Sequence, residues 1–500
     1  MSPRRAGALP LLLRLDPETK QPLNQQIYQG LRSAILDGRL RVGARLPSSR
    51  MLAADFSISR NTVLNAYERL AIEGYLRGQS GGGTCVSTEL PDDILRARAP
   101  FVTQTPKQTR RKISKRAMRI IDVPFRLRIP ELPRGLRAFR IGACALDEFP
   151  TAVWGQLVRR QYSRSVISAL DYGTAPGYPP LRAAVAAYLQ SARGVTCDPE
   201  QVFIVNGSQQ ALDLSSRMLL DPGDTVWLED PGYVGAYGAF VSAGARVVPV
   251  PVDSEGIQVA KGVRHAPDAR VAFVTPSHQF PLGITMTLSR RLELLRWAAK
   301  SGAWILEDDY DSELRYANRP LPALQGLDAQ NSVIYTGTFS KIVFPAVRLG
   351  YVVVPRSMVD TFYKVRLFAD VHPPIFTQAV MTDFIVEGHF ERHIRRMRTL
   401  YRERQEALLD AARRHLDGLL NVLPADGGMH LLGWLPPGID DREASRRAAA
   451  DGIEALPLSD FSLLHQRRGA LLLGYSSLTP EAIHRGAKRL AASLERLIRG

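Results

Sequence analysis

The sequence predicts an α/β fold in which a small winged helix-turn-helix domain precedes a large domain built on a mostly parallel sheet. Three observations predict this arrangement. Positive charge gathers at the front of the chain, helical spacing interrupted by a tight turn fills residues 23–86, and short apolar runs alternate with helical patterns after residue 138. A chain of 500 residues is also too long for one ordinary core.

The composition is that of a folded globular protein, with 45% hydrophobic and 23% charged residues. No apolar run approaches the ~20 residues that span a membrane, and the apolar stretch ending at Leu13 is too short for a signal peptide. We therefore expect a cytoplasmic protein with no membrane partner. The three cysteines, Cys85, Cys144 and Cys197, show no CxxC spacing, so we expect plain thiols and no metal site.

The net charge of +16 is concentrated in the first quarter of the chain. Residues 1–120 hold 21 lysines and arginines against nine aspartates and glutamates, whereas the remaining residues are nearly balanced. A compact basic segment attracts a polyanion and gains affinity by releasing counterions. Double-stranded DNA is therefore the expected partner, although a basic solubilising tail would give the same charge.

The stretch from Leu23 to Val86 is too regular for such a tail. It predicts three helices, the first ending at Asp37-Gly38, the second starting at Pro47-Ser48-Ser49, and the third running from a cap at Ser59 to Glu73. The residues placed on their inner faces are Leu23, Ile27, Leu31 and Ile35, then Met51, Leu52 and Phe56, then Val63, Tyr67 and Leu70. Two short helices joined by a tight turn make a helix-turn-helix.

The start of the third helix is the expected DNA-reading surface. In a helix-turn-helix the first turn of the second helix enters the major groove, which places Ser59, Arg60, Asn61 and Thr62 beside phosphates and base edges. The glycine-rich stretch Arg77–Val86 is predicted to form a hairpin wing. For a single residue such as Arg60, a solvated surface position stays an equal alternative.

Four motifs in this region resemble the winged-helix signature of GntR-type bacterial regulators. They are Leu46-Pro-Ser-Ser-Arg50, Ser59-Arg-Asn-Thr-Val63, Ala66-Tyr67 and Leu70-Ala-Ile-Glu-Gly74-Tyr75. The resemblance implies DNA contacts from Arg50, from residues 59–62, and from the wing near Gly82 and Thr84.

Residues 88–137 are predicted to be a basic linker, because periodicity fades there and proline, threonine and basic residues prevail. The charge of such a segment keeps it solvated and extended. Binding to DNA phosphates is a second possible role. The predicted domains are therefore residues 15–87 for the winged helix-turn-helix, 88–137 for the linker and 138–500 for the large domain.

The large domain alternates buried strands with helices, as parallel α/β sheets do. The predicted strands are Val202–Val205, Thr225–Leu228, Val271–Val274, Trp304–Leu306 and Val333–Tyr335. Polar or glycine-containing residues follow each strand. Because ligands gather at the carboxyl ends of such strands, the functional residues are expected there.

The residues that follow these strands suit a phosphorylated pyridine aldehyde, pyridoxal phosphate (PLP). Lys341 supplies an amine that forms a Schiff base with the aldehyde. Hydroxyl, guanidinium and helix N-terminal groups suited to the phosphate come from Thr338, Ser340 and Arg348 and from the helix opening at Ser208 and Gln209. Taken alone, Lys341 has a plainer alternative as a surface lysine.

Three further residues suit the pyridine ring. Asp308, at the end of a strand, keeps a ring nitrogen protonated, so that the ring withdraws electrons. Tyr310 lies two residues on, on the same face, within reach of the ring hydroxyl, and Tyr233 stacks on the ring. A helix cap for Asp308 and a core aromatic for Tyr233 are the plainer alternatives, but the whole set indicates PLP.

The same residues resemble fold-type I PLP aminotransferases. The matching motifs are Tyr172 with Gly177 and Leu181-Arg182, Gly207-Ser-Gln-Gln-Ala211, Glu229-Asp-Pro-Gly-Tyr233, Glu307-Asp-Asp-Tyr310, and Thr338-Phe-Ser-Lys341 with Arg348. Residues 275–283 (TPSHQFPLG) are similar to the form seen in MocR-type regulators, which join a GntR winged helix to an aminotransferase-like domain. The resemblance implies a homodimer with PLP sites near the subunit interface, where Tyr172 reaches the neighbour's phosphate.

Two departures from the aminotransferase pattern bear on function. Phe280 stands where those enzymes carry an asparagine, which removes a hydrogen bond to the ring oxygen and leaves more to Tyr310. On the strand predicted at 470–475, Leu472 stands about where many of them have the arginine that binds the substrate carboxylate. Arg467 and Arg468 are nearby, in unknown orientation. We therefore expect an amino-acid substrate to be held less firmly.

Two functions follow. In the first, the chain is a PLP-dependent transcription regulator, in which PLP on Lys341, alone or as an imine with an amine or amino acid, alters DNA binding. In the second, it is a working aminotransferase with an accessory DNA-binding domain. The sequence favours the first, with at most weak transaminase activity, because the reading helix is complete while the substrate clamp is missing. The effector, the operator and the sign of regulation stay open.

Overall fold

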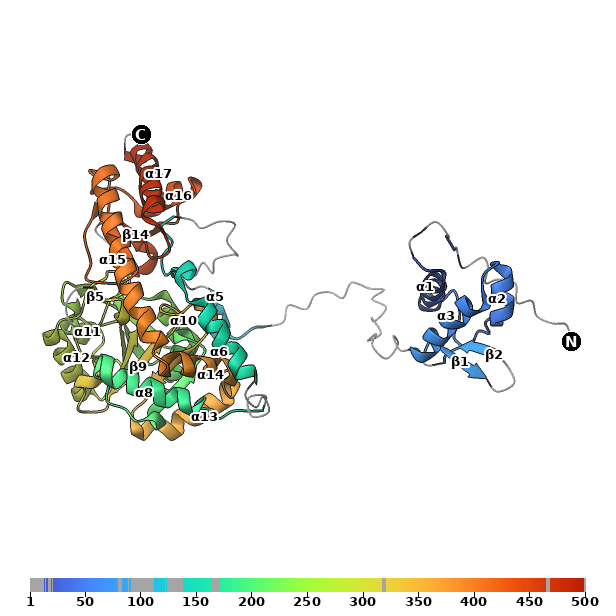
Figure 1. The fold of residues 1–500 in the computed structure, drawn as a ribbon. Helices are drawn as coiled ribbons and strands as arrows, with labels where there is room; N and C mark the ends of the chain where they lie inside the picture. Colours follow the sequence, from blue (N-terminus) through green and yellow to red (C-terminus); the bar gives the residue numbers. More distant parts are fainter. Residues whose placement is uncertain are drawn as a thin grey trace. The chain divides into compact units, whose positions relative to one another are not determined.

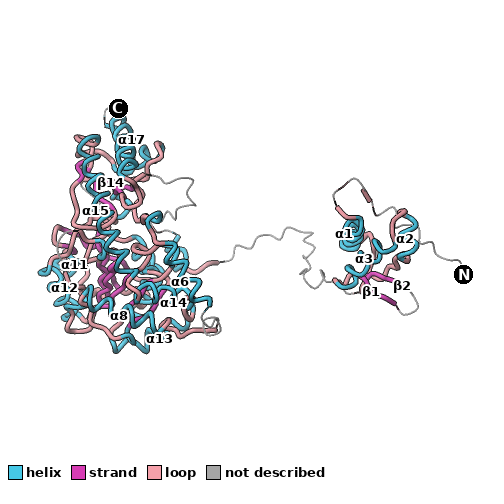
Figure 2. The backbone as a smooth tube through the Cα atoms, in the orientation of Figure 1, coloured by secondary structure: helices cyan, strands magenta, loops and turns pink. Residues whose placement is uncertain are grey.

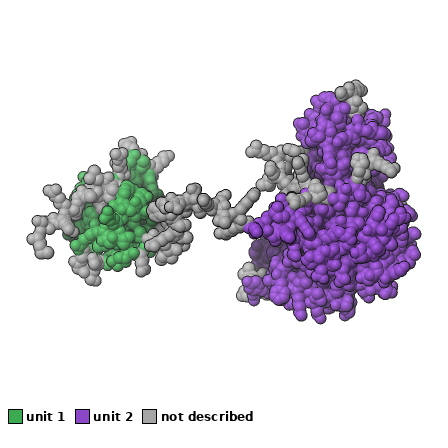
Figure 3. Space-filling model, turned by 180° about the vertical axis from the view of Figure 1, so that it is seen from behind, with its two compact units in different colours: residues 1–111 green, residues 112–500 purple. Residues whose placement is uncertain are grey.

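The computed structural model describes residues 13, 15–16, 19, 21–79, 83–88, 90, 112–121, 123, 138–163, 171–316, 321–464 and 468–498. Its contacts divide the chain into two compact units, Met1–Arg111 and Lys112–Gly500, which Figure 3 colours separately. Each unit has its own buried apolar core. The bounds given above for the linker stay a prediction. In the described part of the chain, no helix has the length and apolar character needed to cross a membrane.

In its described residues, unit 1 has three helices and a β-hairpin, which are labelled in Figure 1. Its elements are α1 (Leu23–Leu36), α2 (Ser49–Asp55), α3 (Arg60–Ile72), β1 (Leu76–Gln79) and β2 (Gly83–Val86). The Ser48 hydroxyl caps α2 by accepting from the Met51 N–H at 3.3 Å, and the Ser59 hydroxyl caps α3 by accepting from the Thr62 N–H at 3.2 Å. The predicted winged helix-turn-helix is therefore present in the described residues.

The inner faces of these helices are the predicted ones except at Leu23, which is half-buried at the start of α1 and lies outside the core cluster, and at Met51. Leu52 of α2 is fully buried, whereas Met51 is 44% exposed. Neighbouring residues on an α-helix point about 100° apart, so on this short helix only one of the two faces the core. Phe56 packs against that core from a position just past the end of α2.

The described residues of unit 2 form two sheets with helices around them; Figure 2 shows the strands in magenta among the cyan helices. The larger sheet contains β3 (Val202–Val205), β4 (Thr225–Asp230), β5 (Arg246–Asp253), β6 (Gly256–Ile257), β7 (Val271–Val274), β8 (Trp304–Asp309), β9 (Val333–Thr338) and β10 (Gly350–Val353). Their order is β3-β10-β9-β8-β7-β4-β5-β6. Neighbours pair in parallel except where β10 and β6 take part.

The five predicted strands are all present in this sheet, as β3, β4, β7, β8 and β9. Three of them, β4, β8 and β9, extend two or three residues beyond their predicted ends. The last residues of these strands include Asp308 and Thr338. These polar residues therefore belong to the strands themselves and lie at the carboxyl edge of the sheet. The mostly parallel α/β fold is confirmed.

The smaller sheet has the order β11-β12-β14-β13. Its strands are β11 (Asn421–Val422), β12 (His430–Trp434), β13 (Leu456–Pro457) and β14 (Ala470–Gly474). The helices of unit 2 are α5 (Lys115–Ile121), α6 (Thr151–Ser163), α8 (Pro179–Arg193), α9 (Ser208–Leu219), α10 (Val234–Ala243), α11 (Val259–His265), α12 (Leu288–Ser301), α13 (Val359–Asp370), α14 (Ile375–Val386), α15 (His389–His415), α16 (Asp441–Ala450) and α17 (Pro480–Ile498). The long α15 packs against α17 beside this sheet (Figure 1).

Helix α5 lies in the stretch predicted as a linker. It contacts α10, which begins directly after Tyr233. Its apolar residues Met118, Ile120 and Ile121 are exposed. This helix is not predictable from the sequence pattern, because it has only seven residues, with basic side chains among them.

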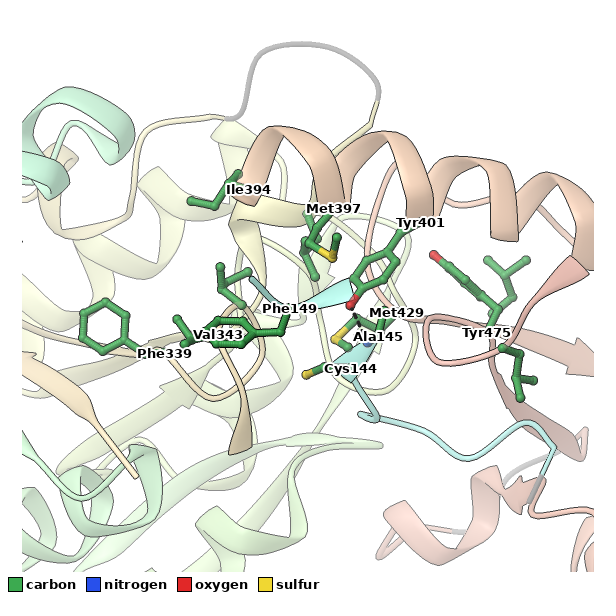
Figure 4. Close-up of a cluster of buried hydrophobic side chains, with 14 of the residues drawn as sticks. Cys144, Ala145, Phe149, Phe339, Val343, Ile394, Met397, Tyr401, Met429 and Tyr475 are labelled. Carbon is green, nitrogen blue, oxygen red and sulfur yellow. Dashed lines mark hydrogen bonds between the residues drawn. The ribbon is translucent and has the colours of Figure 1, made fainter. Parts of the chain in front are cut away.

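A buried cluster of unit 2 supports the segment that carries Lys341. Figure 4 shows Tyr401 of α15, whose hydroxyl accepts the Ala145 backbone N–H at 3.1 Å, beside Cys144. The Cys144 thiol lies 3.4 Å from the carbonyl oxygens of both Ser340 and Lys341, and donates to them. All three cysteines are buried free thiols, as predicted.

Candidate functional site

A cavity of about 490 Å³ lies at the carboxyl edge of the larger sheet. The parallel strands β4, β7, β8 and β9 all end at this edge, which brings together residues from distant parts of the chain. The predicted cofactor residues that line the cavity are Ser208, Gln209, Tyr233, Asp308, Tyr310, Thr338, Ser340, Lys341 and Arg348.

Lys341 lies just past β9, with its amine close to Gly142. Its Nζ donates a long hydrogen bond of 3.4 Å to the Gly142 carbonyl oxygen. Gly142 has a φ of +68°, and a Cβ on it would lie 2.8 Å from Nζ. Glycine therefore suits the left-handed backbone conformation at this position, and a Cβ there would displace the amine of Lys341.

The start of α9 and Arg348 form an anion site. Gly207 precedes the helix with a φ of +92°, and Ser208 is its first residue, so unpaired backbone N–H groups gather there. Nη2 of Arg348 donates to the Asn206 carbonyl oxygen at 2.7 Å, which holds the guanidinium beside this loop. Helix N–H groups, hydroxyls and a guanidinium are the donors that a phosphate needs.

Asp308 and Asp309 end β8 but differ in their partners. Although burial opposes it, Arg193 at 2.7 Å lowers the pKa of Asp309, helped by the Tyr335 hydroxyl. Asp308 has the Thr336 hydroxyl at 3.4 Å, and burial followed by the charge of Asp309 raises its pKa to about 7. A protonated pyridine nitrogen would supply the cation that this buried carboxyl needs. The donor set therefore fits PLP.

Aromatic rings, among them Tyr233, Phe280 and Tyr310, line the cavity beside these polar groups. Phe280 meets Tyr233 and Tyr310 edge to face, at centroid distances of 6.0 and 6.1 Å. The Tyr233 hydroxyl donates a long hydrogen bond of 3.5 Å to the Gln209 amide oxygen. The Phe280 side chain offers no hydrogen-bond donor, and the Tyr310 hydroxyl lies on a ring next to it.

The predicted clamp position and Tyr172 lie apart from this cavity. Leu472 is fully buried in the smaller sheet against Leu458 and Ala470. Arg468 donates from Nε to the Leu435 carbonyl oxygen at 2.8 Å, and Arg467 lies outside the described residues. Tyr172 is 87% exposed, and its role toward a neighbouring subunit stays a prediction.

Several residues that line the cavity were not found from the sequence. They are Arg140, Ile141, Gly142, Val234, Thr275, Asp311, Pro345, Met429, His430, Glu454, Leu456, Asp460 and Phe461. Most come from residues 140–142 and from residues 429–461, which include two strands of the smaller sheet. No local pattern in the sequence shows that these segments meet Lys341. For Gly142 a signal existed, since a glycine inside an apolar run marks a close approach of the backbone.

The predicted DNA-contact residues of unit 1 are accessible. Ser59, Arg60 and Asn61 are exposed at the start of α3, and Thr62 is half-buried. Nε of Arg60 donates to the Ser49 hydroxyl on α2 at 3.3 Å. The remaining predicted contacts are Arg50, exposed on α2, Thr84, half-buried on β2, and Gly82, outside the described residues.

Comparison with known proteins gives two matches along the chain. Residues 23–86 match the gntR family of bacterial regulatory proteins, and residues 141–490 match the class I and II aminotransferases. The "Probable rhizopine catabolism regulatory protein MocR" of Rhizobium meliloti is 41% identical, with 96% of each chain covered. The HTH-type transcriptional regulator TauR of Rhodobacter capsulatus is 32% identical over 96% of this chain and 98% of its own.

A solved structure similar to unit 2 is LysN, the α-aminoadipate aminotransferase of Thermus thermophilus, crystallised with N-(5'-phosphopyridoxyl)-L-leucine. It is 32% identical, covers 77% of this chain and 98% of its own, and superposes with a TM-score of 0.70. The likeness confirms the fold-type I aminotransferase domain and its PLP cofactor. The chain therefore belongs to the MocR-type regulators of the GntR family, transcription regulators in which a DNA-binding winged helix-turn-helix is joined to a PLP-dependent aminotransferase-like domain.

Proposed function

We propose that the chain controls transcription by changing its hold on DNA when PLP binds at Lys341, or when an amine or amino acid reacts with the bound cofactor. PLP supplies an aldehyde and an electron-withdrawing ring. In this proposal Arg348 and the start of α9 bind the phosphate, Asp308 holds a proton at the ring nitrogen, Tyr233 stacks on the ring, and Tyr310 donates to the ring oxygen.

The charged side chains of the cavity favour a role in sensing an effector over the catalytic turnover of a substrate. Of the cationic side chains among its described residues, Lys341 and Arg348 serve the cofactor, and Nε of Arg140 lies 4.0 Å from Oε1 of Glu454. A substrate carboxylate would therefore compete with Glu454 for Arg140. Weak positioning of the substrate slows catalysis but still permits binding and reaction with the cofactor.

We further propose a cytoplasmic homodimer. The exposed Tyr172 would reach the phosphate site of the partner subunit and complete it. A twofold dimer would also present two winged helices to two half-sites of an operator, and a change at the cofactor would alter their spacing.

The test is DNA binding by the purified full chain, with the DNA upstream of its own gene, in the presence and absence of PLP and of a panel of amines and amino acids. A change with PLP alone supports the cofactor as the signal, and a change only after an amine is added supports an amine effector. Sustained keto-acid production over many turnovers at ordinary enzyme rates would instead support the aminotransferase and overturn this proposal.

A further inference from the structure

Tyr310 contacts a buried histidine that is not among the predicted cofactor residues. Nδ1 of His278 lies 2.9 Å from the Tyr310 hydroxyl and 2.9 Å from Oδ2 of Asp311. His278 is 7% exposed and Asp311 3% exposed, so both contacts are shielded from water. The three side chains form a short hydrogen-bonded chain that ends at the cofactor cavity.

The backbone around His278 fits its ring closely. Gly283 and Gly428 have φ values of +75° and +89°. A Cβ on Gly428 would lie 2.2 Å from Cε1 of His278, and a Cβ on Gly283 would lie 3.2 Å from its Nε2. The two glycines leave room for the imidazole in the orientation that brings Nδ1 to Tyr310 and Asp311.

Asp311 determines which nitrogen of the His278 imidazole carries the proton. A carboxylate in contact with Nδ1 favours the proton on that nitrogen, so Nδ1–H donates to Asp311 and, at the same distance, to the Tyr310 oxygen. The Tyr310 hydroxyl is then an acceptor toward His278, and its own proton points elsewhere. Burial, and then the charges of Asp311 and Asp308, raises the pKa of Tyr310 well above 10, so the hydroxyl keeps this proton.

Two described neighbours of Tyr310, Phe280 and His430, offer no free donor to the oxygen of the ligand ring. The Phe280 ring stands at 6.1 Å from Tyr310 and at 5.8 Å from His430, and it has no polar atom. Nε2 of His430 donates to the Pro281 carbonyl oxygen at 2.9 Å, so this N–H is already used.

We propose that His278, held by Asp311, is a positioning residue for the cofactor, which fixes the Tyr310 hydroxyl as a donor toward the ring oxygen of PLP and so sets the pH at which the lysine-bound cofactor changes its visible absorbance. The proposal rests on the assignment of Lys341 and Tyr310 to PLP. A hydrogen-bond donor to the ring oxygen draws electron density from that oxygen. The oxygen then holds the proton that it shares with the lysine nitrogen less tightly. Without that donor, the proton is retained to higher pH.

Other titratable groups surround this chain of side chains. Burial raises the pKa values of Asp308 and Glu229 to about 7, and burial followed by the neighbouring His278 lowers the pKa of His430 to about 4. All three stay in place in the variants described next. A difference between variants therefore reports on His278 and Tyr310.

The test is a spectroscopic pH titration of the full chain loaded with PLP, with His278→Asn and His278→Gln as a matched pair. The amide nitrogen of asparagine reaches the place of Nδ1, whereas that of glutamine reaches the place of Nε2. We expect His278→Asn to titrate like the wild type. His278→Gln and His278→Ala should raise the midpoint by about half a pH unit or more, a threefold change in proton affinity.

A double-mutant cycle shows whether the effect passes through Tyr310. In a Tyr310→Phe background, His278→Gln should give no further shift. An equal shift in both backgrounds, or a wild-type midpoint for His278→Gln, would overturn the proposal. A wild-type protein without any visible band would instead contradict the assignment of Lys341. If His278→Ala fails to fold, the Asn and Gln variants still give the comparison.

Discussion

At the scale of single residues, replacing Lys341 tests whether DNA binding is independent of cofactor binding. Replacing it with alanine removes the amine that attaches PLP, so the Lys341→Ala protein should lose the visible absorbance of the lysine-bound cofactor. Unit 1 has its own core, so basal DNA binding should stay largely intact. Absorbance spectra and a DNA-binding titration of the same preparation check both expectations. Loss of DNA binding by a folded variant would make PLP a structural requirement rather than a signal.

Asp308 gives a prediction about pH. Its pKa is about 7 in the folded, cofactor-free chain and 3.8 as an unperturbed side chain. Below pH 4 both states are protonated. Between about pH 4 and 7 Asp308 ionises in the unfolded state alone, so the free energy of unfolding falls as the pH rises. Above about pH 7 Asp308 is ionised in both states, and the destabilisation has reached its full size.

The Asp308→Asn variant removes this titration. Cofactor-free Asp308→Asn should therefore match the wild type near pH 4 and exceed it above pH 7, by on the order of 4 kcal/mol in the free energy of unfolding. Denaturant unfolding at several pH values measures the difference. With PLP bound the order should reverse, because the asparagine cannot hold the ring nitrogen protonated. A constant difference across the pH range would contradict this account.

At the scale of elements, we propose that α3 carries the sequence-specific part of DNA binding. Nε of Arg60, at the start of α3, donates to the Ser49 hydroxyl. If Arg60 contacts a base edge, its replacement by alanine should weaken operator binding by roughly 1 to 3 kcal/mol. The cofactor spectrum should not change. Arg264→Ala, on an exposed part of α11, removes the same charge from unit 2 and is the matched control. Equal weakening by both variants would mean that net charge alone is responsible.

The elements also show which parts of the structure can be predicted from the sequence. The strands β3 and β7 were predictable because strands buried on both faces are continuous apolar runs, and Asp308 and Lys341 were predictable because polar residues follow such runs directly. Sequence patterns report neighbours along the chain. The approach of Gly142 to the Lys341 amine, and of Gly428 to His278, depends on packing between segments far apart in sequence, which no local periodicity encodes.

At the scale of the whole molecule, Tyr172 tests whether two subunits share each cofactor site. Tyr172 is 87% exposed in a single chain, and if its hydroxyl binds the phosphate in the partner subunit, Tyr172→Phe should weaken PLP binding roughly tenfold or more, as expected for one hydrogen bond to a charged group. A cofactor titration followed by absorbance measures this loss.

Mixed dimers make the test specific. In a dimer of one Lys341→Ala chain and one Tyr172→Phe chain, one site loses both residues, while the other combines an intact Lys341 with an intact Tyr172 from the partner subunit. Unfolding and refolding the two variants together should therefore restore high-affinity cofactor absorbance in the mixed dimers, although neither variant shows it alone. If each chain built its site by itself, mixing would give only the average of the two variants. Recovery on mixing would thus establish both the homodimer and the shared site.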